Sequence, residues 1–134
     1  MTDLELMQLA VEAREMAYAP YSGFRVGAAL LGKSGKVYKG CNVENAAYTP
    51  TNCAERTALF KAVSEGEREF VAIAIVGGRY ESIADFCAPC GVCRQALAEF
   101  CDKDFRVILG NPENVQVFTF GEILPFAFGK GDLE

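Results

Sequence analysis

The stretch FVAIAIVG, residues 70–77, decides the fold class of this 134-residue chain. Its apolar character is unbroken, whereas a strand with one face in water alternates apolar and polar residues. A short continuous apolar run of this kind is typical of a strand that is covered on both faces. We therefore expect an α/β protein in which helices pack on each side of a sheet.

The segments on either side of this strand alternate between helical and strand patterns. We expect helices at 4–18, 53–64 and 91–101, strands at 24–31, 37–43, 105–110 and 115–120, and a helical turn within 121–129. The turn sequence GKSGK predicts an antiparallel hairpin, and helical crossovers predict that the later strands are parallel. The expected fold is a three-layer α/β/α sandwich with a mixed five-stranded sheet, formed by residues 1–134 as a single domain.

Composition and charge exclude several classes of function. Thirteen basic and 18 acidic residues give a net charge of −5, which disfavours a nucleic-acid partner because such proteins carry a concentrated basic face. The cluster Lys33, Lys36 and Lys39 lies at the expected hairpin turn, where a solvated face explains it. No apolar run approaches the ~20 residues of a membrane span, and the acidic N-terminus lacks a targeting signal. We expect a cytoplasmic protein without a membrane partner.

The chain contains six cysteines and no histidine. In a reducing compartment the default interpretation of cysteines is free thiols or metal ligands rather than disulfides. A site for a soft metal must then be built from cysteine, with Asp and Glu as the only other ionic ligands. The cysteines are Cys41, Cys53, Cys87, Cys90, Cys93 and Cys101.

Three of the cysteines are closely spaced, as C-x2-C-x2-C at Cys87, Cys90 and Cys93. An iron–sulfur motif of the bacterial ferredoxin type requires a further Cys after three intervening residues, where Leu97 stands. A thioredoxin-like redox pair and a structural zinc site that adds Cys101 are two other interpretations.

A different combination joins two distant motifs. Cys53, Cys90 and Cys93 are all expected at the starts of helices, and zinc with three protein ligands keeps a fourth position for water. Glu55, in the same first turn as Cys53, can reach that water without being a ligand. This spacing, C-x-E followed by P-C-x-x-C, is that of zinc deaminases. The competing interpretation of Glu55 is a capping box with Asn52 as the N-cap.

These motifs carry a resemblance to a known family. CNVENAAY (41–48), CAERTALFKA (53–62) and PCGVCRQ (89–95) resemble the zinc-dependent cytidine deaminases of the small homotetrameric type with a three-cysteine zinc site. YAPYSGFRVGAAL (18–30) is similar to the segment that precedes them in that family. The resemblance covers most of residues 10–110. It implies a single catalytic domain that hydrolyses cytidine and 2′-deoxycytidine to the uridine nucleosides and ammonia.

The resemblance also implies a chemistry for the motif residues. One Zn²⁺ per chain would be held by Cys53, Cys90 and Cys93. Zinc hydroxide would attack C4 of the base while Glu55 carries protons to the ring and to the leaving amino group. Arg56 would donate to the thiolates and offset their charge, in preference to pointing into solvent.

Substrate contacts are likewise implied by the resemblance. Asn42 and Glu44 would bind the ribose hydroxyls, and Phe24 would pack on the pyrimidine ring unless it is an ordinary core residue at a strand start. The backbone N–H of Ala54 would help to fix the base. The partner is accordingly a small pyrimidine nucleoside.

Two further positions imply assembly. Tyr48 and Phe128 match residues that reach into a neighbouring subunit's site in the family's homotetramers. The chain also departs from the family: residues 77–86 contain no family motif, and Phe126 is bulky where the family often has a small residue.

Other functions remain open at this point. Deaminases of other aminated heterocycles, such as blasticidin S, share the motif, and a non-catalytic zinc or iron–sulfur binding module is a rival of another class. Cys41, Cys87 and Cys101 are interpreted as small buried residues or idle thiols, although Cys87 could compete with Cys90 as a ligand.

Overall fold

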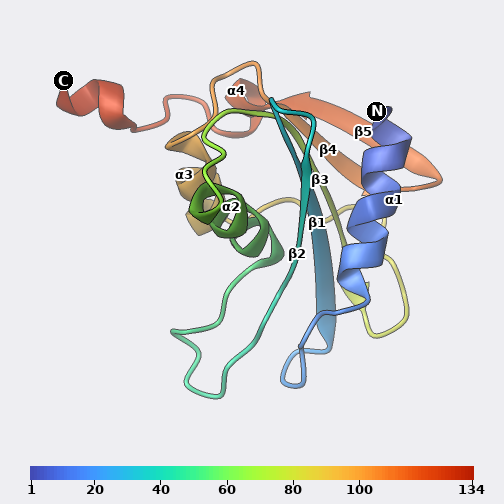
Figure 1. Ribbon diagram of the computed structural model, residues 1–134. Helices are drawn as coiled ribbons and strands as arrows, with labels where there is room; N and C mark the ends of the chain where they lie inside the picture. The colour runs from blue at the N-terminus through green and yellow to red at the C-terminus, as the bar shows by residue number, and fades with distance from the viewer.

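Five strands form one mixed sheet in the computed structural model, which describes residues 1–134 (Figure 1). Their order across the sheet is β2-β1-β3-β4-β5. The strands are β1 (Phe24–Gly32), β2 (Val37–Cys41), β3 (Phe70–Arg79), β4 (Arg106–Asn111) and β5 (Asn114–Thr119). The helices are α1 (Asp3–Arg14), α2 (Ala54–Ser64), α3 (Gly91–Ala98) and α4 (Phe120–Ile123), followed by a 3₁₀ turn at Lys130–Leu133. None of the helices is both long enough and apolar enough to cross a membrane.

The helices lie on both faces of the sheet, as expected for a three-layer α/β/α fold (Figure 1). On one face, α1 covers Ala72, Ala74 and Val76 of β3. On the other face, Ile73 and Ile75 of the same strand belong to the larger core under α2 and α3. Successive side chains of β3 are therefore buried on opposite faces, which confirms the prediction made from residues 70–77.

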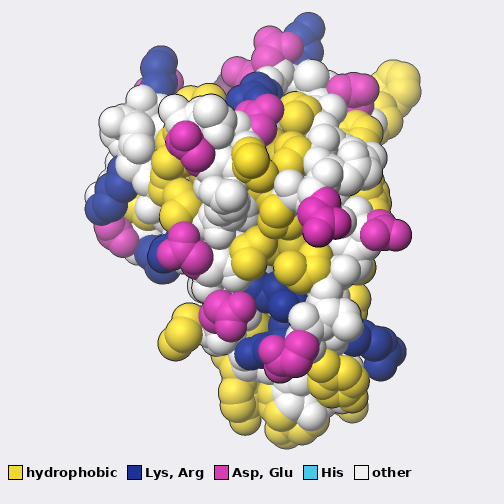
Figure 2. Space-filling view, turned by 90° about the vertical axis from the view of Figure 1, so that its right-hand side faces the viewer, with side chains coloured by type: hydrophobic (Ala, Val, Ile, Leu, Met, Phe, Trp, Pro, Cys, Tyr) yellow, Lys and Arg dark blue, Asp and Glu magenta, His cyan; other side chains and the backbone are white.

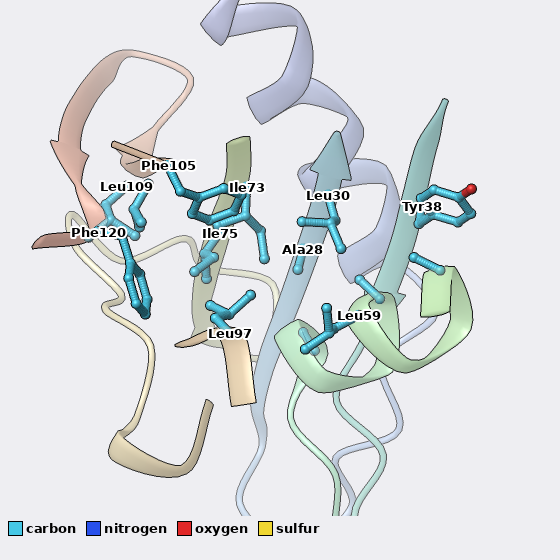
Figure 3. Close-up of a cluster of buried hydrophobic side chains, with 14 residues drawn as sticks. Ala28, Leu30, Tyr38, Leu59, Ile73, Ile75, Leu97, Phe105, Leu109 and Phe120 are labelled. Carbon is cyan, nitrogen blue, oxygen red and sulfur yellow. The ribbon is translucent and has the colours of Figure 1, made fainter. Parts of the chain in front are cut away.

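The larger core joins the two helices that carry the cysteine motifs. Leu59 of α2 and Leu97 of α3 point toward the sheet, where Leu30 of β1 and Ile75 of β3 complete the cluster (Figure 3). All four side chains are essentially buried. Because apolar burial contributes roughly 25 cal/mol per Å², this layer fixes the two helices on the same face of the sheet.

The strand directions agree with the sequence prediction except at β5. The hairpin β1–β2 is antiparallel, and β3 and β4 are parallel. The prediction that the later strands are all parallel was wrong, because β5 pairs antiparallel with β4 in a register that matches Asn111 with Asn114. Only Pro112 and Glu113 lie between these residues, whereas a parallel pair needs a crossover of about a dozen residues or more.

Two helices end earlier than predicted. Helix α1 ends at Arg14 rather than at residue 18, because the N–H of Tyr18 donates to the carbonyl of Asn42 at 2.9 Å, outside any helix. Helix α3 ends at Ala98 rather than at residue 101. Helix α2 begins at Ala54, one residue after the predicted start, with Cys53 at the N-cap position.

Two glycines allow the helices to approach the hairpin closely. A Cβ at Gly27 would lie 2.1 Å from the carbonyl oxygen of Ala10 in α1. A Cβ at Gly40 would lie 2.5 Å from the carbonyl oxygen of Ala54 in α2. Neither separation accommodates a side chain. Glycine at position 27 therefore lets α1 pack closely on β1, and glycine at position 40 lets the first turn of α2 pack closely on β2.

Candidate metal centre and active site

The first turns of α2 and α3 bring three sulfur atoms together. Cys53 is the N-cap of α2, Cys90 is the N-cap of α3, and Cys93 lies in the first turn of α3. The three Sγ atoms lie within 4.8 Å of one another, and those of Cys53 and Cys90 are 3.9 Å apart. Residues separated by 37 positions in the sequence thus face each other.

This arrangement fits a zinc ion. Tetrahedral zinc with Zn–S bonds of about 2.3 Å requires sulfur atoms about 3.8 Å apart, close to the Cys53–Cys90 separation. Only Cys53, Cys90 and Cys93 converge in this way. Cys87 and Cys101 stay outside the cluster, which rules out a four-cysteine zinc or iron–sulfur site. Three thiolates could therefore bind one zinc and leave its fourth position to a non-protein ligand.

Positive partial charges surround the sulfur atoms. The backbone N–H of Cys93 donates to Sγ of Cys90 at 3.4 Å, and Nη2 of Arg56 donates to Sγ of Cys53, also at 3.4 Å. A hydrogen bond from Cys93, together with that from Arg56, lowers the pKa of the Cys53 thiol to about 5. Because the Cys93 thiol donates its proton to Cys53 in this hydrogen bond, the pKa of Cys93 is raised. Arg56 therefore faces the sulfurs, as the sequence interpretation favoured, and its buried Nε has no partner.

Glu55 lies beside this cluster and is almost completely buried, with 5% of its surface exposed. Burial raises the pKa of its carboxyl to about 7, and a hydrogen bond with Cys93 acts in the opposite direction. The capping-box interpretation was wrong: the N-cap of α2 is Cys53, and the side-chain amide of Asn52 donates to Thr57 instead. Glu55 is thus a buried acid, with a pKa near neutrality, that lies next to the sulfurs of Cys93 and Cys53.

A short bridge brings the 42–44 segment to the cysteine cluster. Val43 and Asn52 exchange backbone hydrogen bonds of 2.9 and 3.0 Å, and Asn52 immediately precedes Cys53. The side chain of Asn42 accepts from the N–H of Val26 at 2.9 Å and donates to the carbonyl of Phe24 at 2.8 Å. One N–H and one lone pair of this amide remain for another partner.

Glu44 is held by the turn that precedes β1. Its carboxylate accepts from the N–H groups of Tyr21 and Ser22 at 2.9 and 3.1 Å and from the hydroxyl of Ser22. The hydrogen bond from the Ser22 hydroxyl is the main reason that the pKa of Glu44 lies below its ordinary value. A groove of about 410 Å³ runs past this carboxylate and is lined by Tyr21, Ser22, Glu44, Asn45, Tyr48 and Thr51.

The remaining predicted site residues occupy different environments. Phe24 is half-buried at the start of β1, and Ala54 is buried in the first turn of α2. Tyr48 is 78% exposed at the rim of the groove. Phe128 is 58% exposed on the C-terminal segment that extends away from the sheet (Figure 1). Its carbonyl accepts from the side chain of Gln95 in α3.

The extra cysteines do not join the metal centre. Cys87 is half-buried near Gly77, and burial raises the pKa of its thiol to about 11. Cys101 is also half-buried, with a pKa of about 12 for the same reason. Cys41 is half-buried at the end of β2. Cys90, rather than Cys87, is therefore the third sulfur of the cluster.

Sequence reasoning missed two residues around this site. Ser22 binds Glu44, and its signal was the YSG turn that precedes β1. Arg14 is 4% exposed and continues the buried stripe of Met7 and Ala10 on α1. A charged residue on the buried face of a helix indicates that its side chain is paired with polar groups in the interior.

Comparison with known proteins identifies the family. Residues 1–109 match the family model described as cytidine and deoxycytidylate deaminase zinc-binding region. A cytidine deaminase from Halalkalibacterium halodurans is 54% identical over 129 residues, which cover 96% of this chain and 95% of that protein. The crystal structure of a cytidine deaminase from Burkholderia pseudomallei superposes with a TM-score of 0.87 at 50% identity, covering 96% of this chain and 100% of that one.

A more distant relative bears on the alternative substrate. A blasticidin-S deaminase from Bacillus cereus is 32% identical over 132 residues, which cover 96% of this chain and 93% of that protein. The resemblance inferred from the cysteine motifs is confirmed by these matches and by the convergence of Cys53, Cys90 and Cys93. The chain belongs to the family of zinc-dependent cytidine and deoxycytidylate deaminases.

Proposed function

We propose that this enzyme hydrolyses cytidine and 2′-deoxycytidine to uridine and 2′-deoxyuridine with release of ammonia. The observation that carries the proposal is the buried carboxyl of Glu55 beside the three sulfurs of Cys53, Cys90 and Cys93. The comparisons support it, because two relatives that are 54% and 50% identical to this chain, over 95% and 93% of their own length, carry the name cytidine deaminase.

The three cysteines would hold one zinc ion, which supplies Lewis acidity to activate water at neutral pH. Their thiolates would weaken that acidity by donating negative charge. Arg56 counteracts this effect through its hydrogen bond to Cys53. The first turns of α2 and α3 add the partial positive charge of their unpaired N–H groups.

Glu55 would move the protons of the reaction. A carboxyl whose pKa is about 7 accepts and releases protons with similar ease at neutral pH. In the proposed sequence it takes a proton from the attacking water and gives it to ring N3. It then delivers the second water proton to the exocyclic amino group, so that the C4–N bond breaks and ammonia leaves. A positioned carboxyl of this kind contributes roughly 10²–10⁴ in rate.

The nucleoside would be oriented by residues near the start of β1 and α2. Glu44 suits a ribose because a carboxylate accepts from hydroxyl groups, and it disfavours a phosphorylated sugar by charge repulsion. Asn42 would use its remaining N–H and lone pair on the sugar. Phe24 would pack on the pyrimidine. Ala54 would bind the base through its N–H, which lacks a helical partner at this position.

Assembly and location form a separate part of the proposal. We propose a homotetramer in which Tyr48 and Phe128 contact a neighbouring subunit's site, since both aromatic side chains are largely exposed in the single chain. Phe126 is fully exposed on the same segment. Light scattering of the purified protein tests this, and a monomer contradicts it. The need to keep three ligand thiols reduced supports a cytoplasmic location.

A panel of amino-heterocycles tests the reaction. Ammonia release is measured with cytidine, 2′-deoxycytidine, cytidine 5′-monophosphate and blasticidin S, alongside zinc content. The first two are expected to react well and the phosphorylated compound poorly. Preference for blasticidin S would replace this proposal with the function that the more distant relative's name states.

The role of Glu55 has a matched control at the opposite end of α2. Glu55→Gln is expected to keep one zinc per chain and to lose at least ~10²-fold in turnover. Glu65→Gln, an exposed residue that follows α2 and makes an ion pair with Lys36, should retain full activity. Full activity of the zinc-loaded Glu55→Gln enzyme refutes the proton-transfer role.

A further inference from the structure

The loop that follows β3 is fixed by a buried arginine. Arg14 has no carboxylate within ion-pair distance and donates to four backbone carbonyls. Its Nε donates to Arg25 at 2.9 Å, and its Nη2 donates to Gly78, Tyr80 and Ser82 at 3.0, 2.7 and 2.5 Å. A guanidinium that is 4% exposed needs such acceptors, because burying a charge without partners is costly. Arg14 therefore determines the path of this loop.

Tyr80 connects the loop to the turn before β1. Its N–H donates to the carbonyl of Gly23 at 2.7 Å. Its ring covers the same residue, so that a Cβ at Gly23 would lie 2.6 Å from a ring carbon of Tyr80. Tyr80 adopts φ of 50°, a left-handed conformation that non-glycine residues rarely use. Its strained backbone is thus held between Arg14 on one side and Gly23 on the other.

The turn supported by Tyr80 is the one that holds Glu44. Ser22, next to Gly23, donates its N–H and its hydroxyl to the Glu44 carboxylate. Direct contacts therefore run from Arg14 through Tyr80, Gly23 and Ser22 to Glu44. No residue of this path belongs to the metal cluster.

The loop that contains Tyr80 and the turn that holds Glu44 lie at the same end of the molecule. The loops before β1 and after β3 lie near each other at the lower end of the sheet (Figure 1). Figure 2 shows hydrophobic side chains gathered at this end of the molecule. Tyr21, Gly23 and Tyr80 line one depression there, while Tyr21, Glu44 and Tyr48 line the adjoining groove.

We propose that Tyr80, held by Arg14, is a positioning residue for sugar recognition: it supports the turn that aims the Glu44 carboxylate at the ribose hydroxyls. This inference rests on the proposed function, because it assumes that Glu44 binds the sugar. Tyr80 touches no reacting atom. Its loss therefore weakens the distinction between nucleosides with and without sugar hydroxyls and leaves proton transfer at Glu55 unaffected.

The test compares cytidine with 2′,3′-dideoxycytidine. The ratio of their kcat/KM values is measured for the wild-type enzyme and for Tyr80→Ala, Tyr80→Phe, Glu81→Gln and Glu44→Gln. Tyr80→Ala is expected to reduce the ratio by roughly tenfold. This is the effect of losing about one hydrogen bond between a sugar hydroxyl and the displaced carboxylate of Glu44. The change should fall mainly on KM for cytidine, with kcat for the dideoxy compound unchanged.

Two variants separate this role from general stability. Tyr80→Phe keeps the ring over Gly23 and the backbone bond, so it should retain the wild-type ratio. Glu81→Gln alters an exposed neighbour in the same loop, whose partner is Arg25, and should also retain it. Because Tyr80 as a whole residue is 66% exposed, Tyr80→Ala is expected to fold, which equal zinc content and thermal unfolding will check.

The outcomes distinguish the inference from the proposed function. Wild-type enzyme that releases no ammonia from cytidine overturns the proposed function itself. An active enzyme whose ratio is unchanged in Tyr80→Ala overturns only the role of Tyr80. An unchanged ratio in Glu44→Gln overturns the assumption about the sugar, and with it this inference. The inference is supported if the ratio falls in Tyr80→Ala and in Glu44→Gln and stays at the wild-type value in Tyr80→Phe and Glu81→Gln.

Discussion

Replacing Arg56 by glutamine should weaken zinc binding without removing a ligand. Nη2 of Arg56 lies 3.4 Å from Sγ of Cys53, and its buried Nε has no other partner. Arg56→Gln removes the positive charge beside the thiolates while leaving a polar side chain on α2. The three sulfurs of Cys53, Cys90 and Cys93 stay in place, so the effect reports charge compensation rather than loss of coordination.

The magnitude follows from this contact. The Coulomb attraction of two unit charges at 3.4 Å and an effective dielectric constant of about 20 is about 5 kcal/mol, which is an upper value because both groups are partly solvated. Hydrogen bonds to charged groups contribute about 1.5–3 kcal/mol net. Since about 1.4 kcal/mol corresponds to a factor of ten, the Kd for zinc should rise roughly 10- to 150-fold.

A competition titration against a chromogenic zinc chelator measures this Kd. Arg68→Gln is the matched control, because it removes the same charge from an exposed arginine that donates to the carbonyl of Val63. The control should bind zinc as the wild type does. If Arg56→Gln and Arg68→Gln bind zinc equally well, the guanidinium does not stabilise the thiolates and the electrostatic argument fails.

Three other changes test the site and the core. Cys90→Ser should lose stoichiometric zinc while Cys87→Ser keeps it, as measured by mass spectrometry of bound metal; the reverse result would reassign the ligand. Leu59→Ala should lower the free energy of unfolding in urea by about 2–5 kcal/mol, because it empties a fully buried position under α2. Hydrogen bonds from Ser22 depress the pKa of Glu44 below its ordinary 4.5. Its carboxylate therefore contributes stability that is full above that value and is lost as the pH falls through the depressed pKa. Glu44→Gln should lower Tm at neutral pH, and this difference should shrink as the pH falls through the depressed pKa; a difference independent of pH would contradict this.

The parts of the fold that the sequence predicted correctly are those set by local chemistry. The unbroken apolar run of β3 can only be buried on both faces, and the glycine-containing turn between β1 and β2 requires a hairpin. The direction of β5 was missed although its signal was present. A connection of two residues between Asn111 and Asn114 is too short for the crossover that parallel strands need. The length of the connection therefore decides the direction of β5, whatever the general tendency of α/β folds toward parallel strands.

The site shows how sensitive such predictions are to one residue. With Cys53 rather than Asn52 as the N-cap, Glu55 is the second residue of α2 instead of the third. With Asn52 as the cap, Glu55 would be at the position that reaches back to a backbone N–H. With Cys53 as the cap, the carboxyl of Glu55 is buried beside the sulfurs instead. The motif spacing predicted the convergence of Cys53, Cys90 and Cys93, but the surroundings of Glu55 depended on which residue caps α2.

The contacts that hold the residues proposed to bind the sugar are harder to predict from a sequence. Arg14 and Tyr80 act through backbone carbonyls and a backbone N–H, which every non-proline residue possesses and which leave no mark on composition. Periodicity places Arg14 on the buried stripe of α1 but does not say which loop supplies its acceptors. A loop held in this way can change its side chains freely as long as its carbonyls still reach the guanidinium. Residues 77–86 can therefore lack any family motif and still fix the carboxylate of Glu44.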